Sequence, residues 1–534
     1  MGRRAAFILA VISCAIFFIP ATGWASAYNG QPKLVVVIII DQFRGDYLDR
    51  GRDQFGPNGF RLLMDRGAWF SDCNYQYANT RTAPGHATLF TGTYSNGHGI
   101  LNNEWYDATK KKMITAVDDD STRLVGLDGN YPGFSPHNLL ADTLGDELRM
   151  ATDGKSRVFA ISLKERSSIL PAGYSGTAFW PYKYSGQWIT STYYMKDLPD
   201  WVKSYNKTNP AEKYWNRDWK VGDKLLRRTS KPAELRGEDS FYEIVGSTPY
   251  ANDFELDFAR ELVTQEKLGE GPATDLLLIS LSAPDILGHK VGPNTDESRA
   301  MVQAIDRQLA GFFEFLGNRL GLGNLWIALS ADHGVSTAPS FTKTIGVPSG
   351  YLVDEKIRSA INTQLSAKYG KAEYVPQTEW PLVFLNPDAF TAAKLNEDDA
   401  ERQVADILTQ FGSRGYVGRS QIARHDLPPT PLGKKFANSY APQGGWYLYA
   451  FSPPFTVTRK SGTGTDHAMP YSYDTHVPLM FFGLPFQPGT YRGRCEPVDM
   501  AVTLANLLGI NSPSAAVGRV LTEALAKPAS ESKR

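Results

Sequence analysis

Cysteine is scarce in this sequence, with only three such residues among 534. Cys14 lies in the apolar N-terminal segment, which leaves Cys73 and Cys495 for the rest of the chain. No two cysteines have the short spacing of a thiolate metal site, so a zinc-finger-like centre is excluded. Both a disulfide formed in an oxidising compartment and two buried thiols are compatible with this pattern.

The chain also lacks an excess of charge, because 56 acidic side chains balance 56 basic ones. Proteins that bind nucleic acid or an anionic membrane surface usually carry a basic excess, so we expect neither partner. After the N-terminal segment no stretch is apolar enough to span a bilayer. These absences, with the apolar content of the chain, favour a soluble globular protein.

The N-terminus has the three parts of a secretory signal peptide. MGRR is basic, AAFILAVISCAIFFIPATG is apolar, and Ala25-Ser26-Ala27 fits a small-residue cleavage site. An uncleaved membrane anchor is the alternative, because the apolar stretch is nearly long enough for one. The cleavage site favours removal of residues 1–27, and we expect the mature protein in the periplasm, without a membrane span.

Short continuous runs of aliphatic and β-branched residues recur along the chain without alternating in polarity. They occupy residues 33–41, 156–164, 274–285, 324–334 and 475–483. Such runs are typical of parallel strands covered on both faces, and helical patterns such as residues 297–320 lie between them. The sequence therefore predicts an α/β fold with a doubly wound, mostly parallel central sheet and helices on both faces.

Two long stretches interrupt this alternation, at about residues 172–250 and 336–463. The first is rich in Trp and Tyr, and the second includes a Pro-rich segment at 427–433. We expect both to be insertions in one catalytic domain of residues 28–534, where they could form a cap over the site. The tryptophans favour a side lobe with its own small core, and an aromatic lid is the alternative.

Ionisable side chains follow four of the five runs. They are Asp41, then Lys164 and Arg166, then Asp285 and His289, and finally Asp332 and His333. In open α/β sheets ligands bind beyond the carboxyl ends of the strands, so we expect these groups to meet at one edge. Asp and His are the ligands that suit Zn²⁺ when no Cys is offered, and a His-bearing segment at 462–476 adds to the set. The pattern predicts two adjacent metal sites.

A single threonine, Thr82, precedes Ala-Pro-Gly-His and an apolar run. One interpretation is structural, since Thr is a good helix N-cap and Pro suits the first helical turn. Beside a cation the same hydroxyl could act as a nucleophile, because a metal can stabilise its alkoxide. Free N–H groups at a helix N-terminus also favour an incoming phosphate, so the two interpretations are compatible.

Six ordered motifs together resemble the alkaline phosphatase superfamily. They are VVVIIIDQFRGDYL, TRTAPGHATLFTGTYSNGHGILNNEWYD, ISLKERSSIL, SAPDILGHKVGP, SADHGVS and GTDHAMPYSYDTHVPL. The sequence is most similar to the secreted, phosphate-irrepressible monoesterases, which use a Thr nucleophile and carry a Lys/Arg pair. It is also similar to the related nucleotide pyrophosphatases and phosphodiesterases.

The resemblance implies a role for each candidate residue. Thr82 would be the nucleophile, and Asn103 would donate a hydrogen bond to a phosphoryl oxygen, with Asn102 as a near-duplicate. Lys164 and Arg166, two residues apart in an extended segment, would bind a dianionic phosphate. Two Zn²⁺ ions are implied, one held by Asp41, Thr82, Asp332 and His333, and the other by Asp285, His289 and His467. His476 is the alternative to His467.

The implied activity is hydrolysis of small phosphate monoesters through a phosphothreonine intermediate. A phosphodiesterase or nucleotide pyrophosphatase is the alternative, because that branch shares the Thr and a similar Asn segment. A sulfatase is disfavoured, since TAPGH has neither the Cys or Ser nor the Arg of the sulfatase motif C/S-x-P-x-R. A monomer is favoured slightly over an oligomer.

Overall fold

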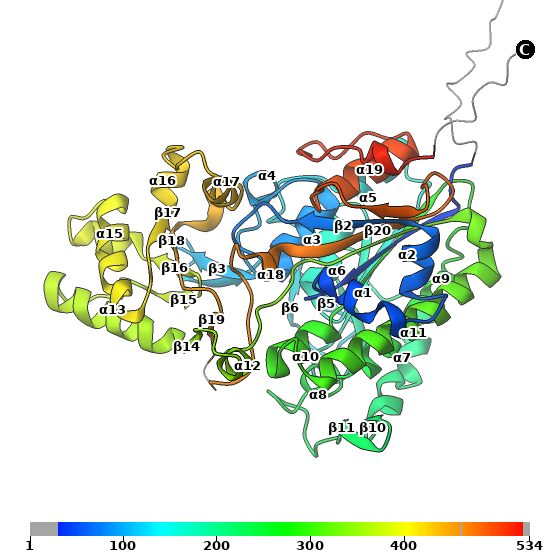
Figure 1. The fold of residues 1–534 in the computed structure, drawn as a ribbon, viewed down its shortest axis with the longest axis horizontal. Coiled ribbons are helices and arrows are strands. Elements are labelled where there is room, and N and C mark those ends of the chain that lie inside the picture. The colour runs from blue at the N-terminus through cyan, green and yellow to red at the C-terminus, as the bar shows by residue number, and fades with distance from the viewer. Residues whose placement is uncertain (1–29, 460–461, 527–534) are drawn as a thin grey trace, which may run out of the picture.

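The computed structural model describes residues 30–459 and 462–526. The predicted signal peptide at 1–27 and the tail at 527–534 lie outside the described residues. Figure 1 shows a large lobe built around a long sheet and a smaller lobe at the left of the view.

The large lobe contains an 11-stranded sheet in the order β21-β2-β20-β13-β1-β12-β7-β8-β9-β5-β6. The strands are β21 (Gly489–Tyr491), β2 (Ala68–Asn74), β20 (His476–Phe482), β13 (Leu325–Ser330), β1 (Leu34–Ile40), β12 (Asp275–Leu281), β7 (Val158–Ser162), β8 (Thr177–Pro181), β9 (Trp188–Ser191), β5 (Asp118–Val125) and β6 (Pro132–Phe134). The central strands from β13 to β8 are parallel, and antiparallel pairs occur on both sides of them. The α/β fold class is confirmed, with a sheet that is parallel at its centre and mixed towards its edges.

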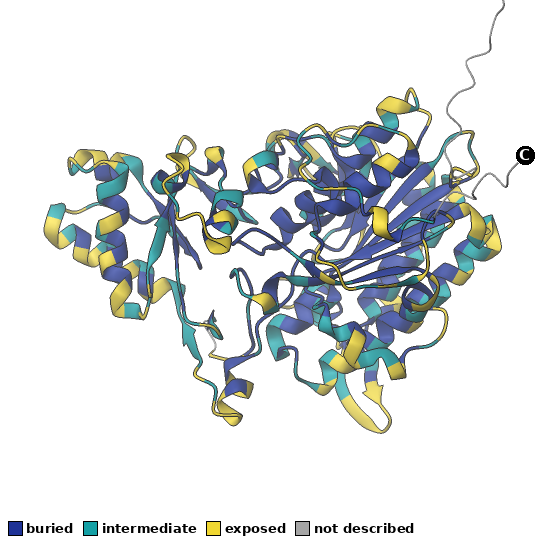
Figure 2. Ribbon diagram, turned by 45° about the horizontal axis from the view of Figure 1, so that its top comes forward, coloured by how far each residue is buried: buried dark blue, intermediate teal, exposed yellow. Residues whose placement is uncertain are grey.

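The central strands are buried on both faces, as Figure 2 shows along their length. All seven residues of β1 are buried, and the same holds for β12. Helix α9 (Tyr250–Gln265) packs on β7 and β12 and also contacts α11 (Asp296–Leu320). Helix α6 (Glu165–Ala172) packs on the same strands and contacts α3 (Thr82–Thr91) and α5 (Leu144–Ala151). Helices on both faces explain why these strands do not alternate in polarity.

The run at 475–483 forms β20, which is antiparallel to both β13 and β2. It does not continue the parallel set, because the chain reaches β20 from the carboxyl edge of the central strands. The segment before it carries His467 at that edge, as described below, so β20 starts there and runs back through the sheet.

The Trp-rich stretch is part of the large lobe. Its first half supplies β8 and β9 of the central sheet, and Trp188 stacks on Phe258 of α9 with ring centroids 3.8 Å apart. Trp180, Trp215 and Trp219 are buried in the same main core. A hairpin of β10 (Asp218–Val221) and β11 (Lys224–Arg228) and the short helix α8 (Phe241–Ile244) follow. Within the described residues these tryptophans extend the main core, so the expectation of a separate small core is wrong.

The second interrupting stretch forms most of the small lobe. Its sheet has the order β15-β16-β18-β17, with β15 (Gln377–Glu379), β16 (Leu382–Leu385), β18 (Trp446–Ala450) and β17 (Tyr416–Gly418). Helices α13 (Asp354–Tyr369) and α15 (Glu397–Leu408) contact this sheet. Ile361, Phe390 and Val404 belong to a hydrophobic cluster distinct from the main core. Here, rather than in the Trp-rich stretch, an insertion has a core of its own.

Cys73 and Cys495 lie opposite each other on neighbouring backbone segments, and both are free and buried. Burial raises the pKa of the Cys73 thiol well above its usual value, which favours the protonated form. Of the two alternatives drawn from the sequence, this structure contains the pair of buried thiols. Among the described residues there is also no helix with the length and apolar character needed to cross a membrane.

Candidate active site

Four charged side chains meet where the parallel central strands end. Asp41 follows β1, Lys164 lies just beyond β7, Asp285 follows β12 and Asp332 follows β13. The Lys164 ammonium donates to Asp41 Oδ2 and to Asp285 Oδ2, at 2.6 Å each. Although burial opposes it, attraction by Asp285 and Asp41 raises the pKa of Lys164 further above its usual value. This buried ammonium joins two carboxylates that are 244 positions apart in the sequence.

The first candidate metal cluster consists of Asp41, Asp332 and His333. One ligand atom from each lies within 4.8 Å of the others, and all three residues are fully buried. His333 Nε2 is 3.5 Å from both Asp41 Oδ1 and Asp332 Oδ2. None of these three atoms has a hydrogen-bond partner. Buried polar atoms are rarely left unpaired, so the arrangement fits a cation bound among them.

The protonation states in this cluster also suit a cation. Burial, together with repulsion by Asp332, raises the pKa of Asp41, and a bound cation would favour its carboxylate form. Burial would raise the pKa of Asp332, but His333 and His86 outweigh this effect and hold that pKa well below its usual range. Burial lowers the pKa of His333 to about 3, which keeps the imidazole neutral, as metal binding requires. His333 Nδ1 donates to the Gly334 carbonyl at 2.9 Å and leaves Nε2 facing the carboxylates.

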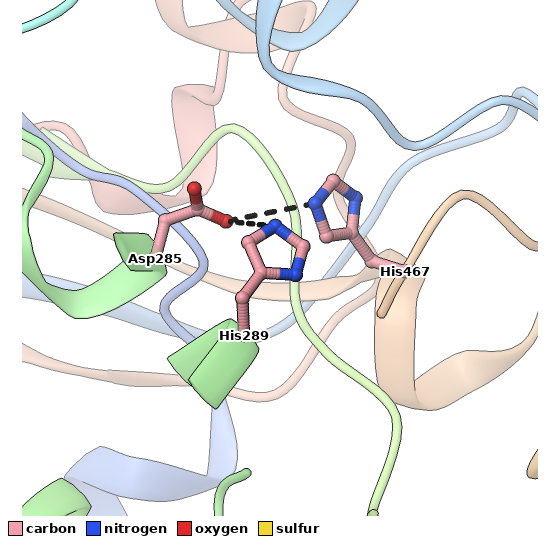
Figure 3. Close-up of side chains that lie close together, drawn as sticks. All are labelled: Asp285, His289 and His467. Atoms are coloured by element: carbon pink, nitrogen blue, oxygen red, sulfur yellow. Dashed lines mark ion pairs between the residues drawn. The ribbon is translucent and has the colours of Figure 1, made fainter. Parts of the chain in front are cut away.

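The second cluster consists of Asp285, His289 and His467, shown in Figure 3. Asp285 and His289 lie one turn apart on α10 (Ala283–Val291), so their side chains share a face. Asp285 Oδ1 is 3.2 Å from His289 Nε2 and 3.5 Å from His467 Nε2. Each imidazole uses Nδ1 on a backbone carbonyl, at 3.1 Å from Thr465 and 2.6 Å from Thr80. Both Nε2 atoms therefore point at the same carboxylate.

His476 lies outside this cluster. It is the first residue of β20, and its Nε2 is 2.9 Å from the Ser71 carbonyl oxygen. Its ring also fills the space beside Gly45, where a Cβ atom would come within 2.7 Å. Of the two histidines in the segment, His467 is the one beside Asp285 and His289.

Thr82 is the first residue of α3 and is 1% exposed. The residue in the N-cap position is Arg81, which has extended backbone angles and no capping side-chain bond. The expectation that Thr82 caps the helix is therefore wrong, because the helix starts one residue earlier than that role requires. Its hydroxyl lies in the first turn, where the backbone N–H groups lack helical partners.

Asn103 reaches the same turn of α3. Its Oδ1 accepts a hydrogen bond from the Ala83 backbone N–H at 2.8 Å. Asn102, by contrast, is fully buried and donates to the Glu104 carbonyl at 3.1 Å within its own loop. The near-duplicate asparagines are thus distinguished by position, and only Asn103 contacts the turn that begins with Thr82.

Lys164 and Arg166 do not lie in an extended segment as expected. The chain turns into α6 directly after Lys164, which occupies the N-cap position, and Arg166 lies in the first turn. Arg166 Nη1 is 3.2 Å from Glu165 Oε1, and its Nε is buried without a hydrogen-bond partner. Burial would lower the pKa of Arg166. The pKa is nevertheless raised, because the guanidinium is attracted by Glu165, Tyr242, Asp41 and Asp285. The guanidinium therefore stays charged beside the clusters.

The sequence analysis did not identify Gln42. This residue has a left-handed backbone, with φ of 63°, directly after Asp41. Its backbone N–H donates to Asp332 Oδ1 at 3.1 Å, and its side-chain amide donates to Asp285 Oδ1 at 2.6 Å. Gly288 leaves room for it, since a Cβ there would lie 1.9 Å from Gln42 Oε1. Gln42 thus connects the two clusters.

His86 is a second residue that the sequence analysis missed. It lies one turn after Thr82, and its Nδ1 is 2.8 Å from the Thr82 carbonyl and 3.3 Å from Asp332 Oδ2. Its Nε2 is 2.7 Å from Ser280 Oγ, which fixes the ring. At Gly85 a Cβ would come 2.4 Å from the Asp332 carbonyl, so α3 lies directly against that backbone. His86 and Gly85 together set the position of Thr82 relative to Asp332.

A third missed group links the site to the small lobe. The Arg81 guanidinium is buried and donates to Asp466 Oδ1 at 3.2 Å and to the Trp380 carbonyl at 2.7 Å. Asp466 precedes His467, and its Oδ1 lies 3.9 Å from His289 Nδ1. Arg81 therefore joins the residue before Thr82 to the second cluster and to the loop beside β15.

The chain matches the family model "Type I phosphodiesterase / nucleotide pyrophosphatase" over residues 35–438. It is 34% identical to a Myroides odoratus protein named "Calcium-transporting ATPase", over 96% of this chain and 98% of that protein. It is 32% identical to "Alkaline phosphatase PafA" of Elizabethkingia meningoseptica, over 93% and 95% of the two chains. "Alkaline phosphatase PhoV" of Synechococcus elongatus is 33% identical over 93% of each chain.

A crystal structure of wild-type PafA has the same fold, with a TM-score of 0.85 at 31% identity. The match covers 93% of this chain and 99% of that chain, so it includes both lobes. These comparisons confirm the resemblance to the alkaline phosphatase superfamily that the six motifs indicated. On this evidence the chain belongs to the type I phosphodiesterase / nucleotide pyrophosphatase family and is similar to its alkaline phosphatases over nearly its whole length.

Proposed function

We propose that the chain hydrolyses phosphate monoesters in two displacements, with Thr82 as the nucleophile and two Zn²⁺ ions as cofactors. The activity itself follows from relatives named alkaline phosphatase that match more than nine-tenths of the chain, so the protein is a phosphomonoesterase. The mechanism is supported above all by the three unpaired atoms of Asp41, Asp332 and His333, which converge on one point.

The family implies a metal cofactor, and the donor sets fit zinc. Each cluster offers carboxylate oxygen and imidazole nitrogen without Cys, which is a common ligand set for catalytic Zn²⁺. We assign Asp41, Asp332 and His333, with the Thr82 hydroxyl, to one ion. Asp285, His289 and His467 hold the other. When bound, such ions stabilise the Thr82 alkoxide and the leaving oxygen and lower the pKa of a water molecule.

The chain's own residues supply the covalent chemistry. Thr82 Oγ1 forms a bond to phosphorus while the bond to the leaving oxygen breaks, which gives a phosphothreonine and an alcohol. A water molecule then attacks the phosphorus atom, the Thr82 oxygen leaves and regains its proton, and inorganic phosphate is released. The positive end of the α3 helix dipole lies at this N-terminus and favours the negative charge that both steps bring to the position.

Three side chains recognise the transferred group. Asn103 lies over the first turn of α3 and would donate its amide N–H groups to one phosphoryl oxygen. Arg166 provides a fork that can bind two oxygens, and Lys164 adds a point charge. A monoester offers three non-bridging oxygens and two negative charges, whereas a diester has lost one of each. The cationic pair therefore favours a monoester over a diester.

The test of this function compares three substrates that differ only at the transferred group: an aryl phosphate, the matching methyl aryl phosphate and the aryl sulfate. We expect kcat/KM for the monoester to exceed both others by at least ~10²-fold, since each lost charge removes a charge-assisted contact. A preference for the methyl aryl phosphate would instead support the phosphodiesterase alternative.

Replacement of Arg166 by alanine should reduce kcat/KM for the aryl phosphate by about 10²-fold, because a charge-assisted bidentate contact is lost. The methyl aryl phosphate should lose less, since it offers fewer oxygens to the guanidinium. Glu165→Gln is the matched control, because it removes the negative charge 3.2 Å from Arg166 and leaves the guanidinium in place. Equal losses for both esters in Arg166→Ala would remove the proposed role.

Replacement of His86 by alanine should weaken binding of the Thr82-side cation by about 10–100-fold, the usual effect of losing a group that orients a metal ligand. The reason is its contact with Asp332 Oδ2 at 3.3 Å. His98→Ala is the control, because His98 is equally buried and, within the described part of the chain, its ring bonds to Thr88 and Ile100 rather than to a cluster residue. Competition with a chelator measures the affinity, and equal affinities in the two variants would contradict the prediction.

The N-terminal segment supports export of the protein. Residues 1–27, which lie outside the described part, have the parts of a signal peptide, and cleavage after Ala27 would release the mature enzyme into the periplasm. N-terminal sequencing of protein recovered from the periplasmic fraction should begin at Tyr28. Retention of the segment on membrane-bound protein would favour the anchor alternative.

A further inference from the structure

A cavity of about 770 Å³ opens beside the second cluster. Asp285 and His289 line it, together with Tyr242 of α8, and this size is typical of a pocket for a small organic ligand. The β10–β11 hairpin contributes Arg227 and Arg228 to the lining. Figure 1 shows this hairpin next to α8 and α10 at the bottom of the view. The Trp-rich stretch therefore supplies part of a wall that reaches the cluster.

Cationic side chains outnumber acidic ones in the lining of this cavity by four to three. They are Arg227, Arg228, Lys290 and Arg459, against Glu238, Glu243 and Asp285. Two of the cations are neutralised locally, since Lys290 is 3.0 Å from Glu243 and Arg228 is 2.7 Å from Asp218. Glu238 is an exposed acid.

Arg227 is different from the paired cations. It has no ion pair with any residue in the described part of the chain, and its Nε is buried without a hydrogen-bond partner. Burial lowers its pKa, and attraction by Glu297 offsets this only in part. A half-buried guanidinium without a partner has donors free for an anion. Arg459 lines the same cavity.

We infer that this cavity receives the leaving group, and that Arg227 and Arg459 select phosphate monoesters whose leaving group carries an anionic carboxylate or phosphate. This rests on the proposed function, in which the leaving oxygen lies at Asp285, His289 and His467. The remainder of the alcohol must then extend into the space that Asp285 and His289 line. An anionic substituent there meets the unpaired guanidinium of Arg227, whereas a neutral one leaves it unpaired.

The experiment compares 4-carboxyphenyl phosphate with 4-carbamoylphenyl phosphate, which match in shape and differ in one negative charge. The measured quantity is the ratio of kcat/KM for the carboxylate over the carbamoyl compound. We expect Arg227→Gln and Arg459→Gln each to lower this ratio by about 5–20-fold, the usual effect of one charge-assisted hydrogen bond. Because each variant is compared with wild type, the intrinsic reactivity of the two esters cancels.

Lys224→Gln is the matched control, since Lys224 lies on the same strand as Arg227 but pairs with Asp296 outside the cavity. It should leave the ratio at the wild-type value. The inference is overturned if both arginine variants keep the ratio within twofold of wild type, or if both esters lose activity by the same factor. A wild-type protein that hydrolyses neither ester would overturn the proposed function as well, so the two failures are distinguishable.

Discussion

Replacing Thr82 with alanine is expected to lower kcat/KM for an aryl phosphate by at least ~10³-fold, the scale seen when a catalytic nucleophile is removed. The phosphorylated protein that can be trapped by acid quenching of the wild type should disappear as well. The reason is geometric, because Thr82 starts α3, His86 Nδ1 lies 2.8 Å from the Thr82 carbonyl and 3.3 Å from Asp332 Oδ2, and Asn103 reaches the same turn.

The Thr82 variant must be shown to keep its cations. The variant loses the Thr82 hydroxyl but keeps the three Asp and His ligands of each cluster, so the metal content should stay near the wild-type value. Thr82→Ser is the matched variant, since it keeps the hydroxyl and should keep part of the activity and the trappable phosphoenzyme. Undiminished turnover by Thr82→Ala, or a phosphoenzyme still formed by it, would reject this nucleophile.

Removal of the metal ions is the second change with a large expected effect. After chelation we expect turnover to fall below about 1% of its starting value, because the alkoxide and the leaving oxygen lose the charges that stabilise them. The apparent Tm should also fall, since ions that bind only the folded chain stabilise it by mass action. Calorimetry and an activity assay on the same sample measure both effects.

The site explains why the metal-free protein should be less stable. Asp41, Asp285 and Asp332 are buried together, and among the described residues Lys164 is the only ammonium bonded to any of them; it donates to Asp41 and Asp285 but not to Asp332. Activity should return when Zn²⁺ is added, with saturation at two ions per chain. Asp332→Asn should bind fewer ions, because it alters the first cluster only. Full activity of metal-free protein, or saturation at one ion, would contradict the two-cluster assignment.

Several parts of this architecture could be predicted from the sequence for a physical reason. Continuous aliphatic runs such as residues 33–41 indicate strands buried on both faces, and ligands gather at the carboxyl ends of such strands. That rule was enough to place Asp41, Asp285 and Asp332 at one edge. A continuous run carries no information about strand direction, however, so the antiparallel orientation of β20 could not be predicted.

The residues that the sequence analysis missed act through contacts between distant parts of the chain. Gln42 donates to Asp332, 290 positions away, and no local pattern signals that contact. His86 could have been noticed, because it lies one turn after Thr82 in a predicted helix. The sequence analysis expects Lys164 and Arg166 in an extended segment. In the structure α6 begins directly after Lys164, so Arg166 lies on a helix instead.

The bond from Arg81 to the Trp380 carbonyl has a consequence for protein engineering. Deleting the lobe that contains Trp380 would take away the acceptor at 2.7 Å, expose the Arg81 guanidinium to water and leave Asp466 as its partner next to Thr82. A truncated enzyme that keeps only the large lobe would thus lose a hydrogen bond that holds Arg81 in place beside Thr82. In chimeras that exchange this lobe between relatives, Arg81 and the loop that contains Trp380 should therefore come from the same parent.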